Sequence, residues 1–146
     1  MKRALITCIA NNKGGVGKTT TAINLAAGLK LLGNKVLVID LDPQGNVAYG
    51  VGIEPYEDVY TMGDVFAGTC TLVDAILQTK YFDLIANNLY SYKKVSPRIL
   101  SNKLDNIFRA NPNVLSHYDF ILLDTPPSIE MMTLNAAYAA DIFLLV

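Results

Sequence analysis

The segment of residues 13–20, Lys-Gly-Gly-Val-Gly-Lys-Thr-Thr, constrains the fold more than any other part of this chain. It follows an apolar run at 4–10. It leads directly into a stretch that ends at residue 32 and starts at Lys18, where alanine and leucine recur at three- and four-residue steps. This order predicts a buried strand, a tight glycine turn and an amphipathic helix. A glycine turn that leads into a helix N-terminus is typical of phosphate sites in α/β proteins.

The turn contains the residue types that a triphosphate requires. Glycine permits positive φ and close approach of the backbone, so several N–H groups can face a phosphate. Lys18 is expected to reach the β- and γ-phosphates, and the Thr19 hydroxyl is expected to bind Mg²⁺. The candidate nucleotide-binding residues are Lys13, Gly14, Gly15, Val16, Gly17, Lys18, Thr19 and Thr20.

The turn departs from the usual G-x-x-x-x-G-K-[ST] pattern at one position. Asn12 stands where the first glycine would be, and Lys13 adds a second lysine to the loop. The alternative interpretation is a glycine turn with incidental lysines. Chance alone gives the seven matching positions in about one chain per million at average composition, so we favour the phosphate loop.

Further apolar runs predict four more strands, at 36–39, 82–86, 120–123 and 142–146. Helices are expected at 18–32, 61–66, 72–77 and 133–140. Another is expected after Ser96-Pro97, with Leu100, Leu104, Ile107 and Phe108 on one face. The alternation predicts an α/β fold, a doubly wound and mostly parallel sheet with helices on both faces. Because the last run reaches Val146, we expect a single domain over residues 1–146, truncated after about five strands, with its C-terminal part missing.

Three carboxylates are expected at the edge of the sheet that carries the glycine turn. Asp40 closes the run 36–39, Asp42 follows it, and Asp124 closes the run 120–123. Open α/β sheets bind ligands beyond the carboxyl ends of their strands, and an aspartate at such an end holds Mg²⁺ in P-loop NTPases. We therefore expect Thr19, Asp40 and Asp124 to form the metal site. Aspartates that merely begin turns are the alternative.

Charge and cysteine content exclude several classes of protein. The chain has 12 basic and 13 acidic residues, a formal net charge of −1, which gives no general attraction to nucleic acid or anionic lipid. Cys8 and Cys70 lie far apart and form no zinc or redox motif, which favours a reducing cytoplasmic compartment. The modest basic cluster Lys93, Lys94, Arg98 and Lys103 is expected to be a solvated face.

Three segments together resemble the ParA/Soj/MinD family of deviant Walker-A P-loop ATPases, and most closely its ParA/Soj branch. They are residues 13–20, residues 38–46 (Val-Ile-Asp-Leu-Asp-Pro-Gln-Gly-Asn) and residues 119–128 (Asp-Phe-Ile-Leu-Leu-Asp-Thr-Pro-Pro-Ser). Residues 134–137 fit more loosely. The resemblance implies that the chain is the N-terminal portion of a single P-loop ATPase domain.

The resemblance also implies roles for single residues. Lys13 would be the signature lysine that reaches the partner's nucleotide in an ATP-dependent homodimer, and a charge supplied in this way is worth about 10³–10⁵ in rate. Lys18 would bind phosphate, and Asp42 would position the attacking water; Lys13, Lys18 and Asp42 are the candidate catalytic residues. Asp124 would be the Walker-B aspartate, with Asp40 as a more distant partner of Mg²⁺. Residues 125–130 would sense the γ-phosphate.

The resemblance implies a slow, partner-stimulated ATPase that segregates chromosomes or plasmids. The ATP-bound dimer would bind non-specific DNA through the missing C-terminal part, in the nucleoid and without a membrane, and a ParB-like protein would stimulate hydrolysis. One alternative is a MinD-type ATPase that cycles on membranes. Others are a metabolic ligase built on the same loop and a truncated chain that binds nucleotide without activity.

Residues 102–105 spell N-K-x-D, the guanine-recognition motif of GTPases. In GTPases this motif follows the Walker-B strand, whereas here it precedes Asp124 and lies in a predicted helix. We therefore expect it to be structural.

Overall fold

The computed structural model describes residues 2–11, 13–56 and 58–146, so Asn12 lies outside the described residues. Strands and helices alternate along most of the chain, as the sequence pattern predicts. In order they are β1 (Leu5–Ala10), α1 (Lys18–Leu31), β2 (Val36–Asp40), α2 (Asn46–Gly50), α3 (Met62–Ala67), the 3₁₀ turn η1 (Val73–Ala75), β3 (Leu77–Gln78), β4 (Asp83–Ile85), α4 (Leu89–Tyr92), α5 (Lys103–Ala110), α6 (Pro112–His117), β5 (Phe120–Asp124), α7 (Met131–Ala139) and β6 (Ile142–Leu145).

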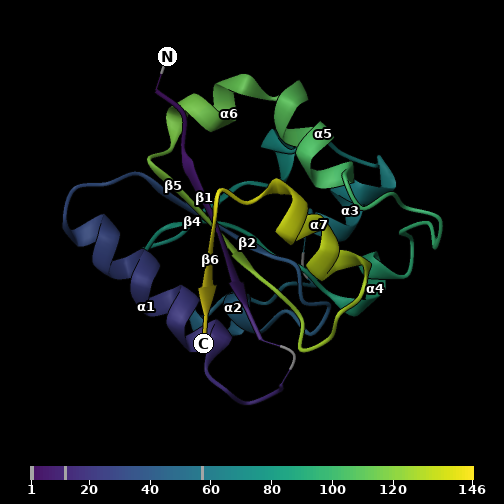
Figure 1. Ribbon diagram of the computed structural model, residues 1–146, viewed down its shortest axis with the longest axis horizontal. Coiled ribbons are helices and arrows are strands. Elements are labelled where there is room, and N and C mark those ends of the chain that lie inside the picture. Colours follow the sequence, from purple (N-terminus) through teal and green to yellow (C-terminus); the bar gives the residue numbers. More distant parts are fainter. Residues whose placement is uncertain (1, 12, 57) are drawn as a thin grey trace.

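The strands form one six-stranded sheet in the order β3-β4-β2-β5-β1-β6. All neighbouring pairs are parallel except β3 with β4, which confirms the expected mostly parallel α/β sheet. β1 and β6 run downward in Figure 1, so the carboxyl ends of the parallel strands lie at the lower edge of that view. The register pairs Asp40 of β2 with Asp124 of β5 at this edge.

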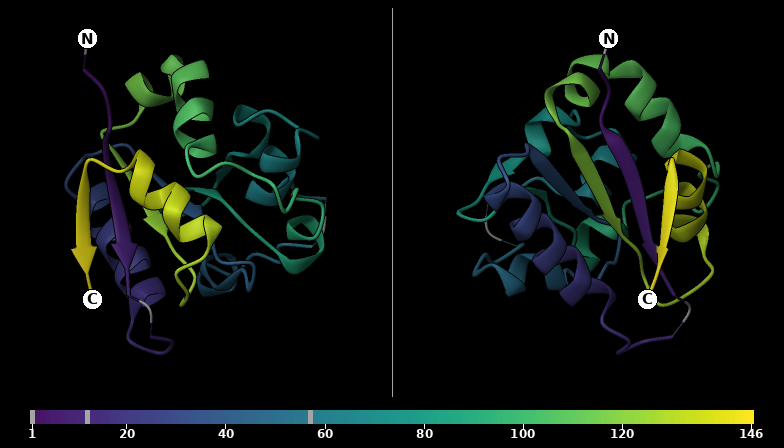
Figure 2. Two further views of the ribbon diagram at one scale, coloured as in Figure 1. Left: turned by 45° about the vertical axis from the view of Figure 1, so that its right-hand side comes forward. Right: turned by 60° about the vertical axis from the view of Figure 1, so that its left-hand side comes forward.

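Helices cover both faces of the sheet (Figures 1 and 2). α1 and α2 pack on one face against Val36 and Val38, while α3, α5, α6 and α7 pack on the other face against Leu37 and Ile39. Both faces of β2 are thus buried, and for that reason its sequence is apolar without alternation. The arrangement leaves the carboxyl edge of the sheet for loops.

The predicted helix at 72–77 is wrong. The only helical turn in this stretch is the short 3₁₀ turn η1, and the backbone of Ile76 is already extended, with φ −73° and ψ 121°. Leu77 and Gln78 then pair antiparallel with β4, where Leu77 lies opposite Leu84. Hydrogen bonding to a free sheet edge overrides the local helical pattern, and it adds a sixth strand to the five that we expected.

The predicted helix after Ser96-Pro97 begins later than expected, at Lys103. Residues 96–102 form turns, and Leu100 is 67% exposed instead of buried. Asn135 of α7 explains the later start. Its Oδ1 accepts the Leu104 N–H at 2.9 Å, and its Nδ2 donates to the Leu100 and Met131 carbonyls.

The N-K-x-D sequence at 102–105 therefore lies at the start of α5, where Leu104 is buried. Within the described residues, no helix combines the length and the apolar character needed to cross a bilayer.

Candidate functional site

The glycine turn carries the backbone from the end of β1 to the start of α1. Gly15 and Gly17 have φ of 70° and 94°, a region that other residues rarely adopt. α1 starts at Lys18 without a side-chain cap and without an acidic residue in its first turn. Its first N–H groups and its positive dipole end are therefore available to an anion.

Lys18 folds back over the turn. Its side chain is buried, and Nζ donates to the Lys13 carbonyl at 2.8 Å. This hydrogen bond holds a positive charge inside the loop. The side chain of Lys13, in contrast, is exposed. The two lysines thus point in different directions, Lys18 into the loop and Lys13 toward solvent.

Asp124 lies beneath the first turn of α1 at the end of β5. Its Oδ2 accepts a hydrogen bond from the Thr19 hydroxyl at 2.7 Å. Its Oδ1 is buried and has no hydrogen-bond partner among the described residues. Burial raises the pKa of Asp124 to about 6, although the Thr19 hydrogen bond opposes that shift. An unpaired buried carboxylate oxygen is costly, and a hydrated cation would satisfy it.

Asp40 is fully buried at the end of β2, and both of its oxygens accept backbone N–H groups. Oδ1 binds the amide of Asp42 at 2.9 Å, and Oδ2 binds the amide of Val47 at 3.3 Å. Burial, and after it the charge of Asp124, raises the pKa of Asp40 well above its ordinary value. Asp40 therefore ties the loop between β2 and α2 to the sheet.

Asp42 belongs to that loop and faces the glycine turn. Its Oδ1 accepts the Gln44 amide at 2.9 Å, a local turn that fixes the carboxylate. Asp42 and Gln44 line the same cavity as Lys18 and Thr19. Asp40 thus supports the loop from below, while Asp42 is the carboxylate that reaches the cavity.

The cavity has a volume of about 380 Å³ and joins three segments of chain. Thr125 holds one wall in place, because its hydroxyl donates to the Ile9 carbonyl at 2.7 Å. Four residues that line the cavity are not singled out as site residues by the sequence analysis: Gln44, Asn46, Thr125 and Pro127. Their positions just after β2 and β5 are the signal that could have identified them. The full lining is Gly14, Gly15, Gly17, Lys18, Thr19, Thr20, Asp42, Gln44, Asn46, Thr125 and Pro127.

The donor set fits Mg²⁺ bound together with phosphate. In the described part of the chain, no group of three or more His, Cys, Asp or Glu side chains forms a metal site made of protein alone. Oxygen ligands are instead available from Thr19, which lines the cavity, and from Asp124, which is buried behind Thr19 and accepts its hydroxyl. Mg²⁺ usually keeps several waters and takes its other ligands from one or two carboxylates and from substrate phosphates.

Comparison with known proteins gives a consistent set of relatives. A family model described as "AAA domain" matches residues 4–146. Chromosome partitioning protein ParA of Caulobacter vibrioides is 42% identical over 147 residues, covering 93% of this chain and 53% of ParA. Sporulation initiation inhibitor protein Soj of Bacillus subtilis is 37% identical over 141 residues, covering 93% of this chain and 55% of Soj. The chain thus spans about half the length of these curated relatives.

The fold also matches a solved structure that contains nucleotide. Cobyrinic acid a,c-diamide synthase from Mycobacterium smegmatis, bound to an ATP analogue and magnesium, superposes with a TM-score of 0.88 at 28% identity. The match covers 97% of this chain and 59% of the synthase. A protein of this fold therefore holds nucleotide and magnesium together.

Proposed function

Since the chain belongs to the AAA domain family, and within it to the ParA/Soj-type P-loop ATPases, we propose that the intact protein binds and hydrolyses ATP as a switch for DNA partition. One observation carries the proposal. Asp124 is buried beneath the glycine turn, bound through one oxygen to Thr19, and its other oxygen has no partner among the described residues. This is the arrangement that a Mg²⁺–triphosphate site requires.

Different residues of the turn and of the neighbouring strand ends bind the phosphates and the metal. The amides of residues 14–19 surround the phosphates, and Lys18 neutralises part of their charge from within the loop. Thr19 and Asp124 would hold Mg²⁺, and Asp40 supports this end of the sheet. Bound Mg²⁺ supplies neutralisation of the charge that develops on the β- and γ-phosphates during transfer.

Asp42 orients the attacking water in this proposal. Its carboxylate lines the cavity and is fixed by the Gln44 amide, while the two Asp40 hydrogen bonds hold the backbone of the same loop. A fixed acceptor aligns a water without first having to be ordered itself. Lys13 is exposed, as a residue must be if it is to reach the nucleotide of a second copy.

At the level of the whole protein, ATP closes a homodimer that binds DNA without sequence preference. The DNA surface is assigned to the part of the relatives' length that this chain does not span, and a ParB-like partner stimulates hydrolysis. Loss of the γ-phosphate releases residues 125–130 and with them the dimer, an order–disorder switch. The relatives named for chromosome partitioning support this role over that of the synthase, which shares the fold. The expected location is the cytoplasm, at the nucleoid.

The proposal is tested by titrating the intact protein with a fluorescent ATP analogue, with Mg²⁺ and after its removal by EDTA. Lys18→Ala is expected to abolish binding, because it removes the one buried cation of the loop. EDTA is expected to weaken binding in the unmodified protein. Lys30→Ala, an exposed lysine in the last turn of the same helix, is the control and should bind normally. Undiminished binding by Lys18→Ala would refute the assignment of the loop.

A further inference from the structure

A second cavity, of about 400 Å³, lies beside α3 and α4 and has no residue in common with the glycine-loop cavity. We call it the tyrosine cavity, because three rings line it together with three charged side chains: Tyr56, Tyr60, Tyr90, Asp58, Asp64 and Lys94. It lies near the carboxyl end of β4, since α3 begins where the Met62 amide donates to the Ala86 carbonyl. α3 and α4 are neighbours at the right of Figure 1.

Asp64 provides the buried negative charge of this cavity. Its Oδ2 accepts three hydrogen bonds, from the Thr61 amide at 2.9 Å, the Thr61 hydroxyl at 3.1 Å and the Ser91 hydroxyl at 3.2 Å. Its Oδ1 is contacted only by Lys94 Nζ, at 3.5 Å, among the described residues. One oxygen is therefore saturated, and the other has a single, long contact with a cation.

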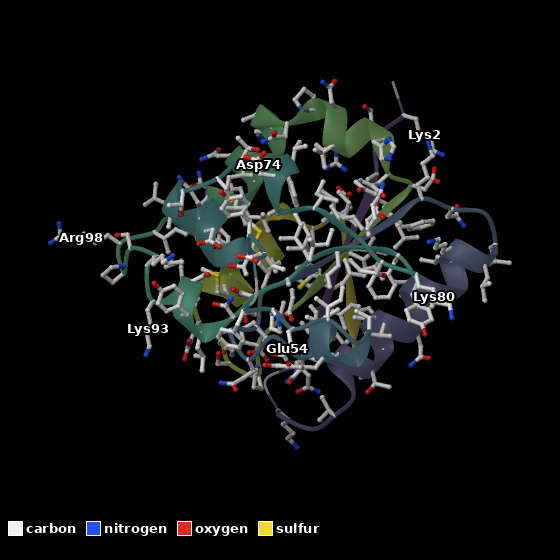
Figure 3. All side chains as sticks on the ribbon, turned by 180° about the vertical axis from the view of Figure 1, so that it is seen from behind. Lys2, Glu54, Asp74, Lys80, Lys93 and Arg98 are labelled. Carbon is white, nitrogen blue, oxygen red and sulfur yellow. The ribbon has the colours of Figure 1, made fainter. Side chains whose placement is uncertain are left out.

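Lys94 shows which ligand chemistry the cavity favours. Its Nζ lies 4.7 Å from the centroid of the Tyr90 ring, as well as near Asp64. The Lys94 side chain is nevertheless 42% exposed, whereas that of Asp64 is 8% exposed. The neighbouring Lys93 points away from the protein at the lower left of Figure 3. The sequence-based expectation of a solvated face thus holds for Lys93, and Lys94 is also exposed, although its Nζ contacts Asp64 and the Tyr90 ring.

The cavity offers more aromatic surface than Lys94 uses. Tyr56, Tyr60 and Tyr90 each leave about half or more of their surface exposed. Tyrosine supplies much of the binding energy in protein interfaces and pairs well with arginine there. Asp58 adds a second carboxylate, and its φ of 45° is the one positive value among the described residues other than glycine. Among the described residues, the charged lining is thus two carboxylates, Asp58 and Asp64, against one lysine.

The wall between α3 and α4 is closely packed before any ligand arrives. A Cβ on Gly63 would lie 2.7 Å from the Ser91 carbonyl carbon and 2.8 Å from the Tyr92 nitrogen. Asn88 also donates to the Pro55 carbonyl at 2.6 Å, which ties the segment before Tyr56 to the end of β4. A preformed site loses less entropy on binding than one that must first be ordered.

We propose that the tyrosine cavity binds an arginine side chain of a partner protein, which displaces Lys94 from Asp64. A guanidinium is planar, so it can stack flat on a tyrosine ring while its N–H groups are directed at Oδ1 of Asp64, the oxygen that is not saturated. Lys94 is the internal cation that occupies this position until the partner binds. The proposal concerns a cavity outside the ATP site, and it stands or falls independently of ATP hydrolysis.

The test uses the full chain without nucleotide and the peptide acetyl-Gly-Gly-Arg-Gly-Gly-amide, followed by NMR shifts of the tyrosine rings. The arginine peptide is expected to bind more tightly than the matched lysine and citrulline peptides. Tyr90→Leu is expected to weaken binding about two- to fivefold, the value of one cation–π contact. Lys94→Met is expected to strengthen binding by a similar factor, because it removes the competitor.

Two matched controls separate this role from general effects of charge. Lys93→Met removes the adjacent lysine, and Tyr81→Leu removes a ring that faces Lys80 outside the cavity. Both are expected to bind the arginine peptide as the unmodified chain does. Asp64→Asn should abolish binding; because Asp64 also caps α3, the Tyr90 and Lys94 variants carry the conclusion if it fails to fold.

Three results would overturn the proposal. One is equal binding of the citrulline and arginine peptides. Another is a Lys94→Met variant whose affinity is unchanged or lower. The third is the absence of saturable shifts at about 10 mM peptide, where even a millimolar dissociation constant would be visible.

Discussion

The glycine-loop cavity and the tyrosine cavity have similar volumes, about 380 and 400 Å³, but opposite kinds of group line them. The first is built on glycines and helix N–H groups around Lys18, and it suits an anion. The second is built on tyrosine rings and two carboxylates, and it suits a cation. Both lie near the carboxyl ends of strands, β1, β2 and β5 in one case and β4 in the other. The carboxyl edge of the sheet thus sets where the two cavities lie, and the loops determine the charge of the groups that line them.

The buried acid behind the glycine-loop cavity, Asp124, and the buried acid that lines the tyrosine cavity, Asp64, differ in how their oxygens are hydrogen-bonded. Asp124 has an oxygen without a partner among the described residues, whereas Oδ2 of Asp64 accepts three hydrogen bonds and Oδ1 contacts Lys94. An acid that awaits a ligand should cost stability, and an acid that already caps a helix should contribute to it. Substitutions in the two cavities should therefore have separate and partly opposite consequences.

The largest effect is expected from Asp42→Ala in the intact protein. The variant should bind ATP but hydrolyse it about 10²–10⁴-fold more slowly, because the group that orients the attacking water is lost. Phosphate release measures the rate, and the affinity of the arginine peptide should not change. Asp74→Ala, which removes an exposed carboxylate from η1, is the control. Normal turnover by Asp42→Ala would remove this residue from the mechanism.

A smaller effect is expected from Gly17→Ala, which forces a side chain into a backbone conformation with φ of 94°. Strain of about 1–3 kcal/mol should weaken nucleotide binding roughly 5- to 150-fold, while peptide binding at the tyrosine cavity stays the same. Gly28→Ala on α1 is the matched control, because a Cβ there meets nothing within 4 Å. If both cavities lose affinity together, they are not independent.

Asp124→Asn and Asp64→Asn should change stability in opposite directions. Without nucleotide and Mg²⁺, Asp124→Asn is expected to raise the free energy of unfolding by about 1–3 kcal/mol, since it removes a buried charge with an unpaired oxygen. Asp64→Asn is expected to lower it by about 0.5–2 kcal/mol through the weakened cap of α3. Urea unfolding measures both. Changes of the same sign would contradict the contrast between the two acids.

The smallest effect is expected on α1. Gly28→Ala should raise the free energy of unfolding by about 0.5–1 kcal/mol, because alanine replaces glycine in an uncrowded position inside the helix. Gly63→Ala beside the tyrosine cavity should instead destabilise the protein and weaken peptide binding, since its Cβ would meet the Ser91 backbone. Thermal unfolding of the pair gives the comparison. A Gly63→Ala variant with normal stability would show that this wall can move.

The glycine-loop cavity could be anticipated from sequence because its parts are local. The turn at 13–20 is contiguous, and Asp40 and Asp124 mark the ends of two apolar runs, so parallel pairing brings them together. The roles of Lys13, Asp42 and the metal ligands remain predictions. The tyrosine cavity was not anticipated, because it joins residues 56–64 to 88–94 across the edge of the sheet.

The errors in secondary structure have the same origin. β3 forms because Leu77 and Gln78 pair with the edge of β4. α5 starts at Lys103 because Asn135 Oδ1 accepts a hydrogen bond from the Leu104 amide. Leu84 lies only seven residues after Leu77, whereas Asn135 lies 31 residues after Leu104, and neither partner changes the local pattern of apolar residues. Local periodicity could therefore predict that a helix exists near 98–109 but could not locate its first residue.

Asn135 has a mechanical consequence. Its side chain joins Met131, the first residue of α7, to Leu100 in the turn before α5 and to the Leu104 amide of α5, so the two helices are connected at one point. The segment 125–130 runs directly into α7. A displacement of residues 125–130 would therefore move α7, and through Asn135 it would also move the start of α5. A change at the carboxyl end of β5 would in this way shift the helices on the face of the sheet opposite α1.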